Sequence, residues 1–342
     1  MRRRLSSTLL TAQAWQRRFS SSRACVWAVA LSVAVTMLSP GLSVAAELSR
    51  APLTHGVYVP GGAQNAALLS AFEVQTGAPA GIVHWYQPWG ASQDPWYQPA
   101  LDVEALRQVT AHGALPLITW EATGAVASAG GLDPSRVRTI VGGQFDTYVD
   151  EWARGLKAFG KPVYLRPFHE MNNPAYAWAY GQSDNTAADE VAAWRYVHDR
   201  FAHIGASNVV WVWSPNTENT QVALSELYPG DGYVDWLGVD GYNGGTQLSW
   251  GGWLSPQQVF GRSYASLTAL SPAKPIMIAE TSSVEQGGSK ADWIQELFRD
   301  LPAAFPNVRA IVWFQADTTA RGEADWRAGT SQSALDAFRQ SA

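Results

Sequence analysis

Short apolar runs alternate along the chain with longer stretches in which apolar positions recur at helical spacing. Continuous apolar runs of this kind are typical of parallel strands that are buried on both faces. The expected strands are Gly56–Val59, Gly81–Tyr86, Leu115–Trp120, Val163–Pro167, Val209–Trp213, Trp236–Val239, Pro275–Ala279 and Ala310–Phe314. Helix candidates between them include Val103–Ala111, Gln144–Phe159, Ala187–His203, Pro256–Leu270, Lys290–Arg299 and Ser333–Arg339.

Eight strand–helix units favour a single closed barrel. About 250 residues is typical of a (β/α)8 barrel, and residues 47–342 are long enough to form one. A doubly wound open sheet has the same alternation, but it usually carries a Gly-rich GxGxxG turn, and this chain has none. We therefore expect an α/β fold, a (β/α)8 TIM barrel, as a single catalytic domain over residues 47–342.

The first 46 residues have a different character from the rest of the chain. They hold six Arg and no acidic residue, and Cys25–Leu38 is an apolar run of 14 residues. That run is shorter than the about 20 residues of a membrane span, and small residues follow it. We expect residues 1–46 to be a secretory signal peptide, cleaved after Ala45 or Ala46. The mature chain would then be secreted or periplasmic, and an uncleaved anchor is the alternative.

The composition of the chain beyond residue 46 indicates which partners and sites to expect. Apolar residues make up 46% of the chain and charged residues 15%, which is enough apolar material for a large core. Beyond residue 46 the chain has 18 basic and 29 acidic residues and no basic stripe, so we expect no nucleic-acid partner. Cys25 is the single cysteine, so the mature chain would carry no disulfide and no Cys-ligated metal. We expect a monomer that does not bind membranes.

Seven of the expected strands run into polar and aromatic residues at their carboxyl ends. This end of a barrel carries the chemistry in enzymes of this architecture. The runs are His84–Trp89, Thr119–Glu121, Arg166–Asn172, Trp213–Asn216, Asp240–Asn243, Ala279–Ser283 and Trp313–Asp317. We expect these residues to line one substrate site at the mouth of the barrel.

Two carboxylates, Glu170 and Glu280, follow strands that face each other across the expected mouth. Two carboxylates across a cleft suit glycoside hydrolysis, in which one protonates the leaving oxygen and the other attacks the anomeric carbon or activates water. The structural alternative is a buried acid paired with Arg166. Sugar rings stack on aromatic faces, and we expect at least three of six tryptophans to contact substrate. These are Trp85, Trp89, Trp120, Trp178, Trp213 and Trp313.

Other chemistries fit the sequence less well. His169-Glu170 begins like a zinc-protease HExxH motif, but residue 173 is Asn. Only His84 and His169 of the six histidines fall at strand ends, and the chain has no GxSxG or Walker-type motif. We therefore expect no metal and no cofactor.

The run Leu165–Asn172, LRPFHEMN, resembles glycoside hydrolase family 26, and the resemblance extends over about residues 55–330. Further points agree with it in order, at His84-Trp85, Thr119–Glu121, Gly238–Tyr242, Ala279–Thr281, Trp313-Phe314 and Asp325–Arg327. The family is best known for endo-β-mannanases, and some members cut mixed-linkage β-glucan or β-1,3-xylan. The resemblance implies a clan A barrel that hydrolyses glycosidic bonds with retention of configuration.

The resemblance also implies a role for each matching residue. Glu170 would be the acid/base and Glu280 the nucleophile, and Tyr242 would hydrogen-bond Glu280. The implied substrate-binding set is His169, Arg166, Tyr242, Trp313, Trp85, Glu121, Trp178 and His84. Within it, His169 and Arg166 would organise the site, Trp313 would floor the subsite of the cleaved sugar, and Trp85 and Glu121 would lie on the glycone side. The loop after Asn172 departs from the family pattern, so either Tyr176 or Trp178 fills the family's aromatic position.

The expected function is a retaining endo-β-glycoside hydrolase that acts on β-1,4-mannan. Mixed-linkage β-glucan, cellulose, xylan or an exopolysaccharide are alternative substrates of the same mechanism, and a non-catalytic glycan-binding barrel is a more remote alternative. Retention requires the two carboxyl groups about 5–5.5 Å apart, and Glu170 must have a raised pKa to remain protonated.

Overall fold

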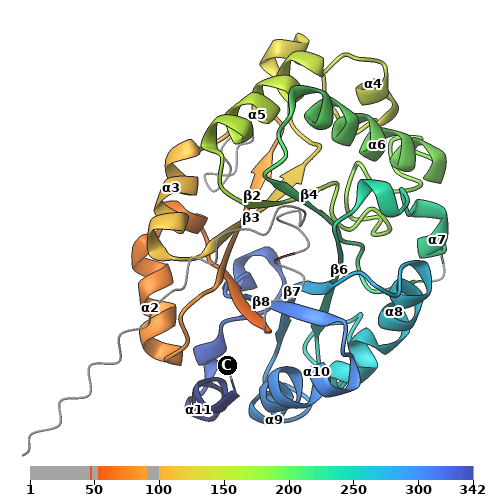
Figure 1. The fold of residues 1–342 in the computed structure, drawn as a ribbon. Coiled ribbons are helices and arrows are strands. Elements are labelled where there is room, and N and C mark those ends of the chain that lie inside the picture. Colours follow the sequence, from red (N-terminus) through yellow and green to blue (C-terminus); the bar gives the residue numbers. More distant parts are fainter. Residues whose placement is uncertain (1–46, 48–52, 91–99, 220, 342) are drawn as a thin grey trace, which may run out of the picture. The chain divides into compact units, whose positions relative to one another are not determined.

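Eight parallel strands close into a barrel in chain order, from β1 to β8. The computed structural model describes residues 47, 53–90, 100–219 and 221–341 (Figure 1). The strands are β1 (Thr54–Tyr58), β2 (Ile82–Pro88), β3 (Leu115–Glu121), β4 (Val163–Pro167), β5 (Val209–Trp213), β6 (Trp236–Asn243), β7 (Ile276–Ser283) and β8 (Val308–Phe314). The predicted (β/α)8 TIM barrel is confirmed.

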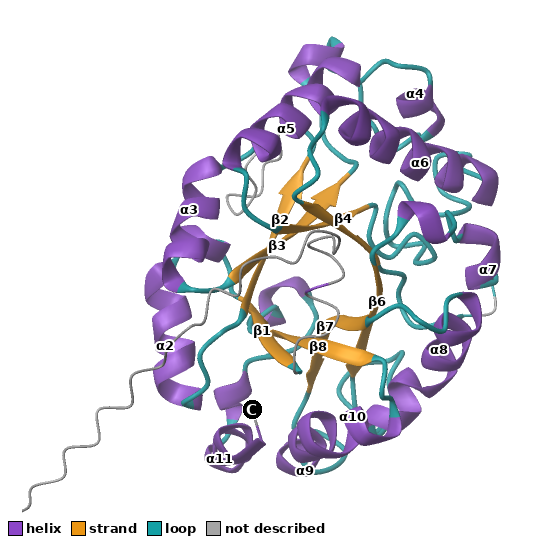
Figure 2. Ribbon diagram, in the orientation of Figure 1, coloured by secondary structure: helices purple, strands orange, loops and turns teal. Residues whose placement is uncertain are grey.

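The helices form a ring outside the strands, as Figure 2 shows. The α-helices are α2 (Ala66–Thr76), α3 (Val103–His112), α4 (Arg138–Val141), α5 (Asp146–Phe159), α6 (Ala187–Ile204), α7 (Leu224–Leu227), α8 (Pro256–Leu270), α9 (Lys290–Gln295), α10 (Leu301–Ala304) and α11 (Gln332–Ser341). The helix expected at Lys290–Arg299 is divided into α9 and a π-helical turn, η4 (Glu296–Asp300). Among the described residues, no helix combines the length and apolar character of a membrane span.

Local sequence signals set where these helices begin. Thr186 and Asp189 form a reciprocal capping box at the start of α6, and Ser255 and Gln258 form another at the start of α8. Each box satisfies backbone N–H groups that a helix end leaves without partners. The Asp102 side chain caps α3 in the same way, by accepting from the backbone N–H of Ala105.

Side chains alternate between the inside and the outside of the barrel. The interior holds a layer of apolar residues that includes Ile82, Leu117, Tyr164, Trp236 and Val312. A larger apolar cluster fills the space between the strands and the helices. Because neighbouring residues of a strand point in opposite directions, every second residue beyond the interior layer points into the mouth.

Strand β7 interrupts this alternation with a β-bulge. Its pairing with β6 steps from Val239↔Ile278 to Asp240↔Glu280, so Ala279 has no opposite residue. Its pairing with β8 shifts over the same stretch. An extra residue of this kind re-aims the side chains that follow it. The bulge therefore turns Glu280 into the mouth although Ala279 belongs to the interior layer.

The predicted signal peptide, residues 1–46, lies outside the described residues. The described part of the catalytic domain, from Leu53 to Ser341, is the barrel itself, so all site residues named above fall within one unit of structure.

Candidate active site

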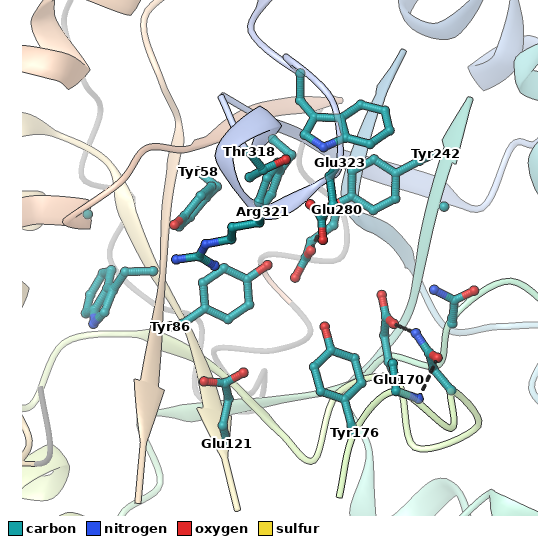
Figure 3. A pocket seen from close by; sticks show the side chains of 18 of the residues that line it. Tyr58, Tyr86, Glu121, Glu170, Tyr176, Tyr242, Glu280, Thr318, Arg321 and Glu323 are labelled. Atoms are coloured by element: carbon teal, nitrogen blue, oxygen red, sulfur yellow. Dashed lines mark hydrogen bonds between the residues drawn. The ribbon is translucent and has the colours of Figure 1, made fainter. Parts of the chain in front are cut away.

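A cavity of about 690 Å³ opens at the carboxyl ends of the strands. Its walls come from strands β1, β2, β3, β6, β7 and β8 and from the loops that follow β4, β5, β6 and β8 (Figure 3). The labelled side chains of Figure 3 are mostly acidic or aromatic, and they converge on the centre of the cavity. This combination of a few polar groups with aromatic walls is typical of a small-molecule or sugar site.

Glu170 and Glu280 both line this cavity, and both are nearly inaccessible, at 4% and 3% exposure. One carboxylate oxygen from each, together with one from Asp240, lies within 4.8 Å of the others. Among the described residues, these three carboxylates lie close enough together that they could hold a cation. Arg166 already lies against Asp240 and Glu280, however, so a side chain supplies positive charge to the cluster.

Two donors fix the Glu280 carboxylate. The Arg166 guanidinium donates to its Oε1, and the Tyr242 hydroxyl donates to its Oε2 at 2.8 Å. Because each oxygen accepts a directed hydrogen bond, the carboxylate has one orientation and its negative charge is stabilised. The predicted hydrogen bond between Tyr242 and the candidate nucleophile is present.

Arg166 is completely buried and is held by several partners. Its Nη1 donates to both oxygens of Asp240, at 2.7 and 2.6 Å, and its Nε donates to Thr119 Oγ1 at 2.8 Å. Burial opposes the charge on this guanidinium, but Asp240 and Glu280 outweigh it and raise the pKa of Arg166 above its usual value. Arg166 is therefore a permanent cation, and Asp240 sets where it points.

Glu170 lies in a strained turn directly after β4. Phe168 and Glu170 have φ of 49° and 51°, a left-handed conformation that non-Gly residues rarely adopt. The backbone N–H of Glu170 donates to the carbonyl of Ser214 at 2.8 Å, and Asn173 Nδ2 donates to Glu170 Oε2 at 2.5 Å (Figure 3). Strain held in place by neighbouring loops is a frequent property of functional residues.

Burial, followed by the nearby charge of Glu280, raises the pKa of Glu170 to about 7. The amides of Asn173 and Asn216 and the charge of Arg166 act in the opposite direction. A carboxyl group with this pKa holds a proton near neutral pH and can also give it up, which suits a general acid.

Three more of the predicted site residues line the cavity, namely Trp85, Glu121 and Tyr242. Trp85 reaches it from β2, where it packs against Gly62. A Cβ at residue 62 would lie 2.5 Å from Trp85 Cβ, so glycine lets this turn approach the indole.

Arg166, His84 and His169 are buried behind the cavity wall and do not line it. His84 Nε2 lies 2.7 Å from Thr119 Oγ1 and 3.3 Å from Arg166 Nη2, so it supports the guanidinium. The ring of His169 packs against those of Tyr86, Tyr176 and Trp178. These three residues therefore do not line the cavity, and Arg166, which was expected to organise the site, holds the carboxylate of Glu280.

Trp313 also lies elsewhere than predicted. It points away from the mouth and packs among Trp293, Phe298 and Phe338 of the outer helices. Its neighbour Phe314 lines the cavity instead and stacks on Tyr58 with ring centroids 4.5 Å apart. The alternation of side chains along β8 explains the difference, since Phe314 takes the position that points into the mouth and Trp313 the position that points toward the helices.

The loop after β4 brings Tyr176 into the cavity and leaves Trp178 behind it. Trp178 is 3% exposed, donates from Nε1 to the carbonyl of His169 at 2.9 Å, and stacks on Tyr176 at 4.6 Å between centroids. Trp178, which was predicted to bind substrate, therefore does not line the cavity. Of the two aromatic residues that the sequence left open, Tyr176 lines the site.

Five of the six tryptophans expected at the site are core residues. Only Trp85 lines the cavity; Trp89, Trp120, Trp178, Trp213 and Trp313 are buried at 3% exposure or less. Trp89, Trp120 and neighbouring aromatics pack together under the helices. The tryptophans that accompany Trp85 in the wall are Trp250 and Trp326, from the loops after β6 and β8.

Several cavity residues had no individual role in the sequence prediction, although Tyr86 and Phe314 lie in strand-end runs that were expected at the site. Tyr86 and Phe314 lie four and two residues after the interior residues Ile82 and Val312 of their strands, and this even spacing is the signal that could have found them. Tyr58 is the last residue of β1. Thr318, Arg321 and Glu323 come from the loop after β8 that contains η5 (Thr319–Arg321). No periodic pattern places residues of such a loop.

Comparison with known proteins agrees with this geometry. A model of glycosyl hydrolase family 26 matches residues 119–299, a stretch that includes Glu170, Asp240 and Glu280. The chain belongs to this family. This match confirms the family resemblance that the sequence motifs predicted, and it places the chain in a family of glycoside hydrolases.

Relatives within the family carry different names. Endoglucanase H of Acetivibrio thermocellus is 38% identical over 279 residues, which cover 80% of this chain and 28% of that protein. A mannan endo-1,4-beta-mannosidase of Bacillus subtilis is 30% identical over 115 residues, 30% of each protein. The chain thus spans less than a third of the length of these relatives. A GH26 beta-mannanase structure from Bacteroides ovatus has a TM-score of 0.61 at 21% identity, covers 86% and 89% of the two chains, and shares the fold.

Proposed function

We propose that this protein is a retaining β-glycoside hydrolase that cleaves a β-linked polysaccharide internally. The observation that carries the proposal is the approach of the Glu170 and Glu280 carboxylates, with oxygens within 4.8 Å of each other. Retaining enzymes place their carboxyl groups about 5–5.5 Å apart, whereas inverting enzymes need about 6.5–9.5 Å to admit a water molecule between them. Membership of family 26 supports the same reaction class.

In the first step, the Glu280 carboxylate attacks the anomeric carbon and forms a covalent ester. Glu170 donates its proton to the glycosidic oxygen, and the bond between that oxygen and the anomeric carbon breaks. Its pKa of about 7 allows Glu170 to hold this proton at neutral pH. Arg166 and Tyr242 hold the carboxylate of Glu280 in the attacking orientation before the sugar arrives.

In the second step, Glu170 accepts a proton from water, and the water oxygen attacks the anomeric carbon to release the sugar from Glu280. The charge of Glu280 is one cause of the raised pKa of Glu170. Formation of the ester removes that charge, so the proton affinity of Glu170 changes in step with its two roles.

We place a β-glucan first among the substrates. The relative that matches 80% of the chain is named an endoglucanase, whereas the mannosidase match covers 30% of the chain. The β-1,4-mannan expected from the sequence remains the second candidate, supported by that shorter match. Neutral polar groups and aromatic rings in the cavity suit either polymer.

The experiment is a release assay on mixed-linkage β-glucan, cellulose, β-mannan, glucomannan and β-1,3-xylan, with reducing ends and viscosity followed together. If the enzyme cleaves the polymer internally, viscosity should fall rapidly while only a few new reducing ends have formed. Glu280→Gln should abolish release, and Glu104→Gln, an exposed acid on α3, is the matched control that should not. Binding to a polymer with no release by the unaltered protein would contradict the proposal and indicate a non-catalytic glycan-binding barrel.

A further inference from the structure

A second hollow of about 280 Å³ adjoins the catalytic cavity, and Thr217, Tyr242 and Trp250 line both. Thr217 follows Asn216, whose side chain hydrogen-bonds Glu170. Tyr242 contacts Glu280, but through Thr217 the hollow continues the cavity on the side of Glu170, the proposed proton donor. In the proposed reaction, the leaving-group part of the substrate lies on that side, because Glu170 protonates the leaving oxygen.

Trp250 stands between the two hollows with 63% of its surface exposed. The other large apolar side chains that are exposed among the described residues are aliphatic. A Cβ at Gly244 would lie 3.0 Å from the Cη2 and Cζ3 atoms of this indole, so one edge of the ring rests on a glycine. An indole that is supported by backbone and open to solvent offers an apolar face to a ligand.

The segment that carries Trp250 is fixed to the barrel. The buried Asn243 side chain accepts from the backbone N–H groups of Gly245 and Leu254, at 3.3 and 3.1 Å. Within the turn, the N–H of Leu248 donates to Gly244 and the N–H of Gly251 donates to Leu248. A platform that is already ordered loses little conformational entropy when a ligand binds.

Charged groups lie beside this indole in the second hollow. Glu218 and Arg262 both line it, and Arg262 Nε donates to Glu218 Oε2 at 3.1 Å. Ser266 Oγ donates to the same oxygen at 2.7 Å, and the Glu218 backbone N–H donates to Ser263 Oγ at 2.7 Å. An aromatic face next to a fixed donor–acceptor pair matches a sugar ring, which has apolar C–H faces and hydroxyl groups at its edge.

We propose that Trp250, with Glu218 and Arg262, forms a distal subsite for a sugar on the leaving-group side of the polysaccharide. The proposal rests on the proposed hydrolase function and extends it. A chain bound along both hollows would be cleaved internally, so this subsite would make long substrates better than short ones.

The test uses the hexasaccharide and the trisaccharide of the polymer that the unaltered protein hydrolyses. Trp250→Ala should lower kcat/KM on the hexasaccharide by about tenfold, the loss expected for one aromatic contact, and much less on the trisaccharide. It should also shift cleavage of the hexasaccharide toward its reducing end, because binding modes that use the distal subsite are weakened. Trp250→Phe, which keeps an aromatic face, should recover most of the loss.

Val74→Ala, at an exposed apolar position on α2, is the control and should change neither value. The unfolding temperature of Trp250→Ala should equal that of the unaltered protein, because its indole is largely exposed. Equal losses on both substrates, or an unchanged cleavage pattern, would overturn the subsite while leaving the hydrolase intact. An unaltered protein that cleaves no polymer would instead overturn the proposed function and the subsite with it.

Discussion

At the residue scale, the site depends on how buried charges are balanced. Arg166 carries one positive charge between the carboxylates of Asp240 and Glu280; Arg166 and Asp240 are fully buried, and Glu280 lines the cavity. Removing Arg166 would leave the two carboxylates of Asp240 and Glu280 without their shared cation, and unpaired buried charges are strongly destabilising. Among the described residues, the amides of Asn173 and Asn216 are the hydrogen-bond partners of the Glu170 carboxyl group, and neither is a cation. The two carboxyl groups therefore differ in their partners, since a guanidinium and a hydroxyl hold Glu280 whereas amides hold Glu170.

The pH dependence of hydrolysis should report Glu170 directly. The first step needs its protonated form, so kcat/KM should fall as pH rises through about 7, the value to which burial and Glu280 raise the pKa of Glu170. The Asn173 amide lowers that pKa by stabilising the carboxylate. Asn173→Ala should therefore move the alkaline limb to higher pH, whatever it does to the maximum rate. The measurement is a pH profile of kcat/KM for both proteins, and a limb that moves to lower pH would contradict this assignment.

Replacing Glu170 should affect substrates unequally. Glu170→Ala removes proton donation, which contributes about 10²–10⁴-fold in such reactions. Cleavage of the polymer should fall by that factor, and formation of the covalent intermediate from an activated aryl glycoside should fall far less, because its leaving group needs no proton. Stopped-flow measurement of aryl release separates the two. Equal losses on both substrates would argue that Glu170 has another role.

The sequence located the two cavity carboxylates, Glu170 and Glu280, but not their surroundings. Glu170 and Glu280 could be found because each follows an apolar strand in a recognisable motif. Asp240 lay in one of the strand-end runs, yet its pairing with Arg166 depends on two side chains that are 74 residues apart. The sequence did not show that His84 and His169 lie behind the cavity wall, since a strand-end position does not say which rings will cover a side chain.

At the element scale, alternation and one bulge decide what faces the mouth. Trp313 and Phe314 are neighbours on β8, but Phe314 lines the cavity and Trp313 packs under the helices. The bulge in β7 has the reverse effect, because it brings Glu280 into the cavity where strict alternation would turn it outward. The period of two was readable from the sequence, whereas the bulge was not, since it depends on pairing with β6 and β8 together.

The two aromatic residues of β8 should respond differently to truncation. Trp313→Ala should cost about 3–5 kcal/mol of unfolding free energy, as for other buried tryptophans, and leave KM of the remaining folded protein near its original value. Phe314→Ala should raise KM, because Phe314 and Tyr58 form part of the cavity wall. Denaturant unfolding and steady-state kinetics on both variants provide the check. If the folded Trp313→Ala variant had a raised KM and an unchanged unfolding free energy, Trp313 would instead be a substrate-binding residue.

At the scale of the whole molecule, the fold followed closely from the sequence and the cavity only in part. Eight predicted strands match β1 to β8 with small changes at their ends, because burial on both faces leaves a strong apolar pattern. The Trp-rich composition was a weaker guide, since most tryptophans expected at the site serve the core between strands and helices. The loops that carry Arg321 and Trp250 also line the cavity. Their conformations could not be predicted from the periodic pattern of apolar residues.

Export of the protein is a prediction that rests on residues 1–46. We propose that residues 1–46 direct secretion and are removed, because six Arg precede a short apolar run and small residues. Mass spectrometry of the protein recovered outside the cytoplasm should show an N-terminus at Ala46 or Glu47. Recovery of the chain from membranes with residues 1–46 still attached would indicate an anchor.

The central claim is double displacement by Glu280 and Glu170, and the anomeric configuration of the first product tests it most directly. Proton NMR can follow hydrolysis of the preferred polymer or its hexasaccharide in the first minutes, before the anomers equilibrate. Retention predicts that the β-anomer of the new reducing end appears first and the α-anomer grows later by mutarotation. Initial appearance of the α-anomer would show inversion and contradict a covalent intermediate on Glu280.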